Sequence, residues 1–269
     1  MVPRTSRSWI LIRGLGRGVG HWATFESRIK SKFPTDRFYF IDLPGNGYMH
    51  KIETPTDLTE FTPYMIQQLK KQNYDFKDKA YGLGFSLGAM ALVELQNFAP
   101  DFFEKIILIN TSAANFSSVF DRLRFKAILL AFQLLFIKDL AARELKTLTV
   151  TTTLTEAAIT EKYKKDLDLI IQYSQNHRSK PSNIWRQLLA ASGYQFPIRR
   201  NCRVLILSGA QDSFVSPKCS KAIEKNWQCE HEIHPNAGHD ICFEDPDWVI
   251  ENMIDRPNQL DNAQDDHLG

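Results

Sequence analysis

The most informative segment of the chain is Tyr81-Gly82-Leu83-Gly84-Phe85-Ser86-Leu87-Gly88-Ala89-Met90. Its pattern predicts a strand that ends, a sharp turn at Ser86 and a helix that begins. Glycine two residues before and two residues after the serine removes side chains that would collide with the flanking strand and helix. The turn therefore exposes the Ser86 hydroxyl as a candidate nucleophile and points the Leu87 amide toward the place where an oxyanion would form. Taken alone, the pentapeptide also fits a small-residue turn in any α/β protein.

Short apolar runs alternate with helical patterns on both sides of this segment. The predicted strands are 9–12, 38–41, 79–84, 105–110, 204–208 and 230–234, and the predicted helices between them are 23–33, 62–71, 89–95, 217–226 and 247–254. This alternation predicts an α/β fold with a mostly parallel sheet of about six strands and helices on both faces. Ligands of such sheets bind at the carboxyl ends of the strands.

The alternation stops over residues 113–196, where helical patterns indicate an insertion. The helices predicted there are 120–140, 155–175 and 181–192. We therefore expect a core formed by residues 1–112 and 197–255, an inserted helical unit and a polar tail at 256–269.

The composition is that of an ordinary globular chain, with 269 residues, 43% hydrophobic and 24% charged. The apolar run 9–12 is too short for the core of a signal peptide, and the apolar segment 127–137 is about half the length needed to span a bilayer. The four cysteines form no C-x-x-C pair, and the net charge of +2 does not indicate nucleic-acid binding. We expect a cytoplasmic protein without a metal site, a membrane span or a nucleic-acid partner.

Two segments near the carboxyl end of the chain supply the other groups that a serine nucleophile needs. Asp212 follows one predicted strand and His239 follows the next, 27 residues later. A free serine hydroxyl is a poor nucleophile at neutral pH, whereas an imidazole can take its proton and a carboxylate can orient the imidazole. The order Ser86, Asp212, His239 is the order of nucleophile, acid and base in α/β-hydrolases. Asp240 and Glu244 are alternative acids and His21 is an alternative base.

The first predicted strand opens into Arg13-Gly14-Leu15-Gly16-Arg17-Gly18-Val19-Gly20, whose glycines make the backbone amides accessible. A dinucleotide-binding loop is the competing interpretation, but the spacing G-x-G-x-G-x-G differs from G-x-G-x-x-G. Asp42 follows the next predicted strand, at the position from which an acidic residue would bind the ribose of a dinucleotide. The chain continues there as Leu43-Pro44-Gly45-Asn46-Gly47, which does not fit that interpretation. We therefore expect no organic cofactor.

Together, these segments resemble the α/β-hydrolase superfamily over nearly the whole chain apart from the insertion and the tail. The resemblance implies that the Leu15 N–H is the second oxyanion donor, beside that of Leu87, that the insertion is a cap over the active site, and that no cofactor is required. The sequence departs from the family at Arg13, because a histidine usually precedes the glycine there. It also begins at what is usually the third strand.

The insertion is basic and aromatic. Residues 113–196 contain 12 Lys/Arg and 7 Asp/Glu, so they carry +5, whereas the remainder carries −3. Such a patch attracts acidic partners, although a solvated helical face is the alternative. The candidate contacts to an acidic partner are Arg122, Arg124 and Lys126. The candidate substrate contacts are Trp22, Phe116, Phe120, Phe132, Phe214 and Val215.

In size, triad spacing and cap position, the chain resembles the small cap-bearing serine esterases of this superfamily, including the pimeloyl-carrier-protein methyl ester esterases of biotin synthesis. That resemblance implies an ester linked to an acidic acyl carrier protein as substrate. The same triad also fits thioester hydrolysis, lyase chemistry, C–C bond hydrolysis or acyl transfer. A hydrolase-fold binding protein with little turnover is a third hypothesis, and an apolar cap that binds lipid interfaces is a further alternative.

Overall fold

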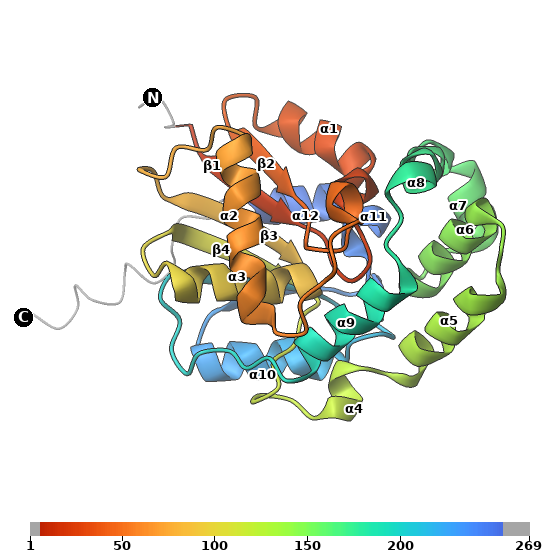
Figure 1. The fold of residues 1–269 in the computed structure, drawn as a ribbon. Coiled ribbons are helices and arrows are strands. Elements are labelled where there is room, and N and C mark those ends of the chain that lie inside the picture. Colours follow the sequence, from red (N-terminus) through yellow and green to blue (C-terminus); the bar gives the residue numbers. More distant parts are fainter. Residues whose placement is uncertain (1–5, 255–269) are drawn as a thin grey trace, which may run out of the picture.

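A six-stranded parallel sheet forms the centre of the computed structural model, which describes residues 6–254 apart from the side chains of Ala131 and Leu135 (Figure 1). The strands are β1 (Ser8–Ile12), β2 (Arg37–Ile41), β3 (Ala80–Phe85), β4 (Phe103–Ile109), β5 (Arg203–Gly209) and β6 (Glu230–His234). Their order is β2-β1-β3-β4-β5-β6, and every neighbouring pair is parallel. The predicted fold class is confirmed, and the loops after all six strands emerge at one edge.

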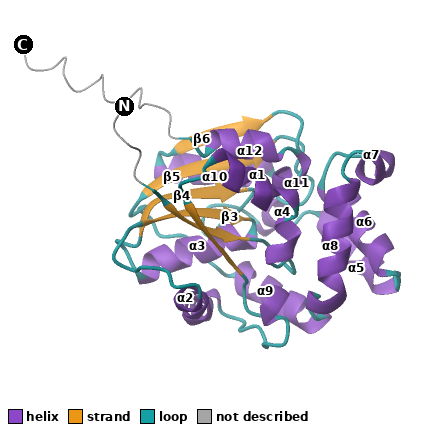
Figure 2. Ribbon diagram, turned by 90° about the horizontal axis from the view of Figure 1, so that it is seen from above, coloured by secondary structure: helices purple, strands orange, loops and turns teal. Residues whose placement is uncertain are grey.

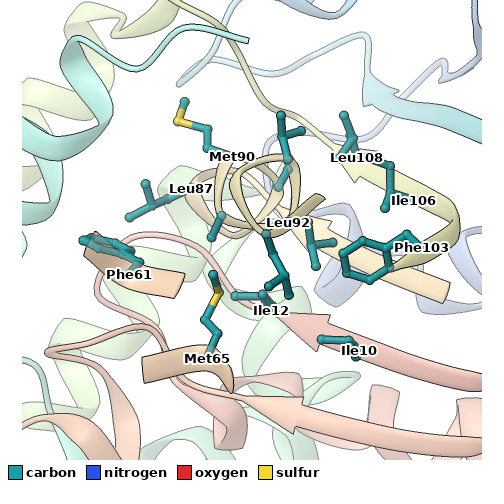
Figure 3. Packing of buried hydrophobic residues seen from close by; sticks show 14 of the residues in the cluster. Ile10, Ile12, Phe61, Met65, Leu87, Met90, Leu92, Phe103, Ile106 and Leu108 are labelled. Carbon is teal, nitrogen blue, oxygen red and sulfur yellow. The ribbon is translucent and has the colours of Figure 1, made fainter. Parts of the chain in front are cut away.

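The inner strands are mostly apolar because both of their faces are buried, and their charged residues, Glu104, Lys105 and Arg203, lie near the amino ends of β4 and β5. Alternate residues of β1 illustrate this arrangement: Ile10 and Ile12 contribute to one core, and Trp9 and Leu11 contribute to the other. Figure 3 shows the first core, where Ile10 and Ile12 lie among side chains of β4 and of the neighbouring helices.

Helices cover both faces, as the alternation predicts (Figure 1). On the face of the first core lie α2 (Thr62–Lys71), α3 (Leu87–Phe98), α10 (Pro217–Trp227) and the short helix η3 (Leu58–Phe61). On the opposite face lie α1 (Thr24–Lys32), α11 (Ile241–Glu244) and α12 (Pro246–Asn252). Two further short helices, η1 (Val19–Trp22) and η2 (Gly47–Met49), belong to the loops after β1 and β2.

Six helices form the segment between β4 and β5, on the side of the sheet to which the strand arrows point (Figure 2). They are α4 (Val119–Arg122), α5 (Phe125–Phe136), α6 (Leu140–Thr151), α7 (Glu156–Glu161), α8 (Lys164–His177) and α9 (Pro181–Ser192). Leu148, Ile159, Leu167 and Ile170 form a small core of their own with Phe243 from α11. The division of the chain into a core and a cap stays a prediction, and the predicted tail at 256–269 lies outside the described residues.

The structure corrects the predicted helix 120–140, which is divided into α4 and α5. It also shows a helix, α6, that the sequence patterns do not indicate. Its carboxyl half is rich in threonine, a β-branched residue that disfavours helices. Thr147, Thr149 and Thr151 each donate their hydroxyl to the carbonyl four residues earlier, which satisfies these groups within the helix. Asp139 caps its amino end by accepting from the Ala142 N–H.

None of the helices within residues 6–254 has the length and hydrophobicity that crossing a membrane requires.

Candidate active site

Ser86 occupies the turn between β3 and α3 with a φ of 54° and a ψ of −115°, a conformation that L-residues rarely adopt. A Cβ on Gly84 would lie 2.6 Å from the Ala89 Cα in α3, and a Cβ on Gly88 would lie 2.3 Å from the Ile12 carbonyl oxygen in β1. Both contacts are impossible for real side chains, so the steric reason for the two glycines is confirmed.

The backbone of Ser86 is held from β4 and its following loop. The Ser86 N–H donates to the Ile109 carbonyl at 2.8 Å, and the Thr111 hydroxyl donates to the Ser86 carbonyl at 2.9 Å. Among residues 6–254 the Ser86 hydroxyl itself has no hydrogen-bond partner, and its side chain is only partly buried. The strained turn therefore presents an unengaged hydroxyl.

The two predicted oxyanion donors are free and lie on the two segments that flank this hydroxyl. Leu87 is the first residue of α3, and its N–H makes no hydrogen bond to any described residue; the same holds for the Leu15 N–H. A Cβ added to Gly14 would lie 3.1 Å from the Ser86 Cβ, so the loop after β1 passes directly beside the serine. Their role as an oxyanion hole stays a prediction, supported by this placement.

Asp212 and His239 form a buried pair. The imidazole Nδ1 lies 2.7 Å from Asp212 Oδ2, and the two side chains are 8% and 1% exposed. The other carboxylate oxygen, Oδ1, accepts the N–H groups of Phe214 and Val215 at 2.7 and 3.0 Å. With its Nδ1–H donated to the carboxylate, the imidazole keeps Nε2 available as a base.

The imidazole lies beside the serine turn, although no hydrogen bond joins Ser86 Oγ to His239 in the described part of the chain. The His239 ring is packed between Phe85, the residue before Ser86, at 4.9 Å between centroids, and Phe214 at 5.4 Å. Catalytic hydrogen bonds are often long or poorly aligned in the absence of substrate. The structure thus joins the predicted acid and base, and the role of Ser86 stays a prediction.

Asn110, which the sequence patterns do not indicate, connects three loops of the site. Its amide nitrogen donates to the carbonyls of Gly238 and His239 at 3.2 and 2.6 Å, and its amide oxygen accepts from the Gly209 N–H at 2.9 Å. Its φ of 46° places it in the left-handed region that asparagine tolerates better than most residues. In the sequence, the feature that could have indicated this role is an asparagine at the carboxyl end of the predicted strand 105–110.

We expect Asn110→Ala to destabilise the protein by about 2–3 kcal/mol, because it leaves polar backbone groups unpaired and because alanine tolerates a positive φ less well than asparagine does. Asn110→Gly separates the two effects, since it removes the same hydrogen bonds without the backbone strain. Urea unfolding of both variants measures the difference. Equal stability of Asn110→Ala and the unchanged protein would contradict this assignment.

Arg13, the departure from the family pattern, forms a buried bidentate ion pair with Asp240, the residue after His239. The two hydrogen bonds measure 3.0 and 2.6 Å, and the side chains are 3% and 5% exposed. The guanidinium also lies over the rings of Trp22 at 5.0 Å and Phe85 at 4.8 Å. Despite the cost of burial, Arg13 holds the pKa of Asp240 below its ordinary value. Asp240 is therefore engaged as a structural partner of Arg13, so we retain Asp212 as the acid.

The segment Asp42-Leu43-Pro44-Gly45-Asn46-Gly47 supports the loop after β1. Asp42 accepts the N–H groups of Val19 and Tyr48 at 2.7 and 2.8 Å, and Asn46 donates to the Gly14 carbonyl at 3.3 Å. Burial raises the pKa of Asp42 to about 6. From the inserted segment, Gln187 on α9 accepts the Gly16 N–H at 2.9 Å. Asp42 thus supports the loop after β1 through these backbone contacts.

His21, the alternative base, belongs to a separate buried network between the loop after β1 and the inserted helices. Its Nδ1 accepts the Gly18 N–H at 3.0 Å, and its Nε2 lies 3.2 Å from the Ser174 hydroxyl, which donates to Glu144 at 2.8 Å. Arg17 pairs with the same carboxylate. Burial lowers the pKa of His21 to about 4. Both ring nitrogens are engaged, so His21 is a poor candidate for the catalytic base.

This network predicts an acid-dependent loss of stability. Because the pKa of His21 is about 4 when folded and 6.5 when unfolded, the unfolded chain binds the proton first as the pH falls. Stability from this residue is therefore lost between about pH 6.5 and 4, by on the order of 2–3 kcal/mol. The raised pKa of Asp42 changes stability with pH in the opposite direction. The measurement is therefore the difference in the free energy of unfolding between the unchanged protein and His21→Gln, obtained by urea unfolding at each pH. A pH-independent difference would contradict the prediction.

The predicted substrate contacts are divided among three environments. Trp22 is 2% exposed and packs on Phe25 in the second core, and Phe116 packs on Phe196 and Trp227. Phe120 and Phe132 are 84% and 57% exposed, so they do not line an enclosed pocket. Phe214 and Val215 lie next to the Asp212–His239 pair. The role of all six as substrate contacts stays a prediction.

Two of the three predicted basic contacts already bind the protein itself. Arg122 donates to the carbonyls of Ala191 and Ser192 at 2.6 and 2.7 Å, and Arg124 donates to the Asp212 carbonyl at 2.9 Å. Lys126 is exposed. Within residues 6–254, no cluster of three or more His, Cys, Asp or Glu residues is arranged to hold a metal ion.

A parallel sheet with a serine on the β3–α3 turn, and with an Asp–His pair on the loops after β5 and β6, defines an α/β fold of the hydrolase type. The sequence profile described as "Alpha/beta hydrolase family" matches residues 9–252, and the chain therefore belongs to this family. A search of curated protein sequences gave no significant match.

Solved structures with the same fold share little sequence with this chain. A putative non-heme bromoperoxidase, BpoC, from Mycobacterium tuberculosis is 17% identical, with a TM-score of 0.68 and coverage of 93% of this chain and 91% of that one. A thermophilic esterase from Thermogutta terrifontis is 16% identical, with a TM-score of 0.69 and coverage of 93% and 88%. The esterase RhEst1 from Rhodococcus sp. is 16% identical, with a TM-score of 0.64 and coverage of 92% and 89%. At this identity the likeness establishes the fold alone.

Proposed function

We propose that this protein is a serine hydrolase that cleaves carboxylic esters through an acyl-enzyme on Ser86. The observation that carries the proposal is the strained turn that presents a free Ser86 hydroxyl and a free Leu87 amide next to the buried Asp212–His239 pair. The structurally similar esterases agree with this reaction class, and family membership makes hydrolysis the first expectation.

The proposed reaction assigns each group one role. His239 Nε2 takes the proton as Ser86 Oγ attacks the acyl carbon, while Asp212 holds the Nδ1–H and stabilises the imidazolium. The N–H groups of Leu15 and Leu87 donate to the oxyanion. The imidazolium returns the proton to the departing alcohol, and a water activated by the same imidazole then releases the acid.

The direct test combines a fluorophosphonate probe with a p-nitrophenyl ester series of increasing chain length. We expect labelling and ester cleavage by the unchanged protein, and neither by Ser86→Ala. Ser192→Ala is the matched control, because Ser192 lies exposed at the end of α9 and its hydroxyl donates to the nearby Leu189 carbonyl, while its contact with Arg122 is made by the backbone. Absence of both labelling and cleavage in the unchanged protein would contradict the proposal and favour the binding-protein hypothesis.

The finer substrate class proposed from the sequence is the methyl ester of an acyl chain carried by an acidic acyl carrier protein. Because Arg122 and Arg124 bond to backbone carbonyls, docking of the carrier would depend mainly on Lys126. Lys126→Glu is expected to raise the KM for a carrier-linked methyl ester and leave the KM for a free methyl ester unchanged. Thioester analogues in the same assay test the alternative chemistry of the triad.

A further inference from the structure

The inserted helix α5 carries a continuous apolar stripe on its solvent side. Phe125, Ile128, Leu129, Phe132 and Phe136 follow the spacing of one helix face. They are 74%, 51%, 40%, 57% and 70% exposed, and Val119 and Phe120, on the preceding helix α4, are 61% and 84% exposed. Exposed apolar patches of this extent mark sites that bind another surface.

The opposite side of α5 is packed, so the helix presents the stripe in a fixed orientation. Leu130 is 5% exposed, and Arg143 on α6 donates to the Ile137 carbonyl just after α5 at 3.0 Å. At the amino end, the Arg124 N–H donates to the Phe214 carbonyl at 3.0 Å. Figures 1 and 2 place α5 at the outer edge of the inserted helices. The stripe therefore begins beside the loop of the catalytic acid and runs outward from it.

Charge at the ends of the stripe indicates what it binds. Residues 119–138 contain four basic residues and one acidic residue. Lys126 is exposed near the start of α5 and Lys138 just after its end. Asp121 is bonded to the Ser118 hydroxyl at 2.9 Å, and the next acidic residue, Asp139, accepts from the Ala142 N–H at 2.7 Å. An apolar face flanked by lysines is the pattern of helices that lie in the interface of an anionic membrane.

We propose that the stripe of α4 and α5 docks onto a lipid surface that contains anionic lipids, with Phe120, Phe125 and Phe132 in the acyl boundary and the lysines at the headgroups. A second copy of the chain fits less well, because a symmetric pair through the same stripe would bring the basic segments together. A lipid layer also accepts an irregular row of side chains without shape complementarity. The proposal does not depend on the activity of Ser86.

The test is sedimentation of the full chain with vesicles of phosphatidylcholine alone or mixed with phosphatidylglycerol. We expect binding to the mixed vesicles, weakened by high salt. The double variant Phe125→Ser/Phe132→Ser should lower the partition coefficient by about tenfold or more, and Lys126→Glu/Lys138→Glu should abolish the preference for the anionic lipid. Phe98→Ser/Ile198→Ser is the matched control, since these apolar residues are 64% and 84% exposed outside α4 and α5.

A spectroscopic variant reports the docking side chain directly. Phe132→Trp should show a blue shift of fluorescence on addition of mixed vesicles, and Phe98→Trp should not. Circular dichroism of each variant establishes that it is folded. Failure of the unchanged protein to bind either vesicle would overturn the proposal. So would a concentration-dependent dimer that Phe125→Ser/Phe132→Ser dissociates, because the stripe would then join two copies.

Discussion

Replacement of Ser86 by alanine is expected to lower kcat for ester hydrolysis by about 10⁴-fold or more and to leave the fold intact. The proposed activity depends on a covalent bond that alanine cannot form. Stability should change little, because the hydroxyl has no hydrogen-bond partner among residues 6–254 and the backbone is held by Ile109 and Thr111. Steady-state kinetics and thermal unfolding measure the two quantities.

Further variants test whether Ser86 and His239 act as one catalytic unit or contribute separately to the reaction rate. His239→Ala should be about as inactive as Ser86→Ala, and the double variant should be no worse than either, since the two groups act in one step. Asp212→Asn should lose about 10⁴-fold because an amide would favour the wrong imidazole tautomer. Multiplicative losses in the double variant would show that His239 does not activate Ser86.

Replacement of Arg13 by methionine is expected to destabilise the protein by about 3–5 kcal/mol, because it leaves the Asp240 carboxylate buried without its partner. For a chain of this size, that loss lowers the Tm by roughly 10 °C. Activity should fall as well, since Asp240 adjoins His239 and Arg13 adjoins the loop of Leu15. Arg13→Lys should rescue only part of both losses, because an ammonium cannot reproduce the bidentate contact.

A double-mutant cycle separates the pair from its surroundings. Arg13→Met/Asp240→Leu should be more stable than either single variant, since no buried charge is left unpaired. Arg28→Met is the matched control: Arg28 pairs with Asp247, but the two side chains are 47% and 65% exposed, so the expected loss is about 0–1 kcal/mol. Equal losses for Arg13→Met and Arg28→Met would mean that the buried pair contributes no more than a surface pair.

The pH dependence of the same pair has a definite sign. Because the pKa of Asp240 is lowered in the folded protein, its contribution to stability is present above the ordinary carboxyl value of 3.8 and is lost as the pH falls below it. His21 loses its contribution at higher pH, between about 6.5 and 4. As the pH falls, His21 therefore loses its contribution to stability first and Asp240 loses its contribution at lower pH.

Local patterns predicted the elements of the sheet well because their causes are local. Strand β6 and helices α2 and α9 have the predicted boundaries. A proline near the start of each of the two helices marks its amino end. The threonine-rich helix α6 was missed because packing against α8 and internal hydroxyl bonds outweigh its low propensity. Two of the candidate substrate contacts, Phe120 and Phe132, are exposed, which the sequence could not show because residue spacing does not say which side of a helix is covered.

By itself, the sequence determined the fold class and the strained turn at Ser86, and it predicted the roles of Ser86, Asp212 and His239, because glycine spacing and strand-end positions carry this information within a few residues. Only the tertiary structure showed that Arg13 pairs with Asp240, 227 residues away, that Asn110 binds the His239 loop, and that Arg122 and Arg124 are already engaged. A buried polar side chain has to find a partner, but which one it finds depends on how distant segments pack together.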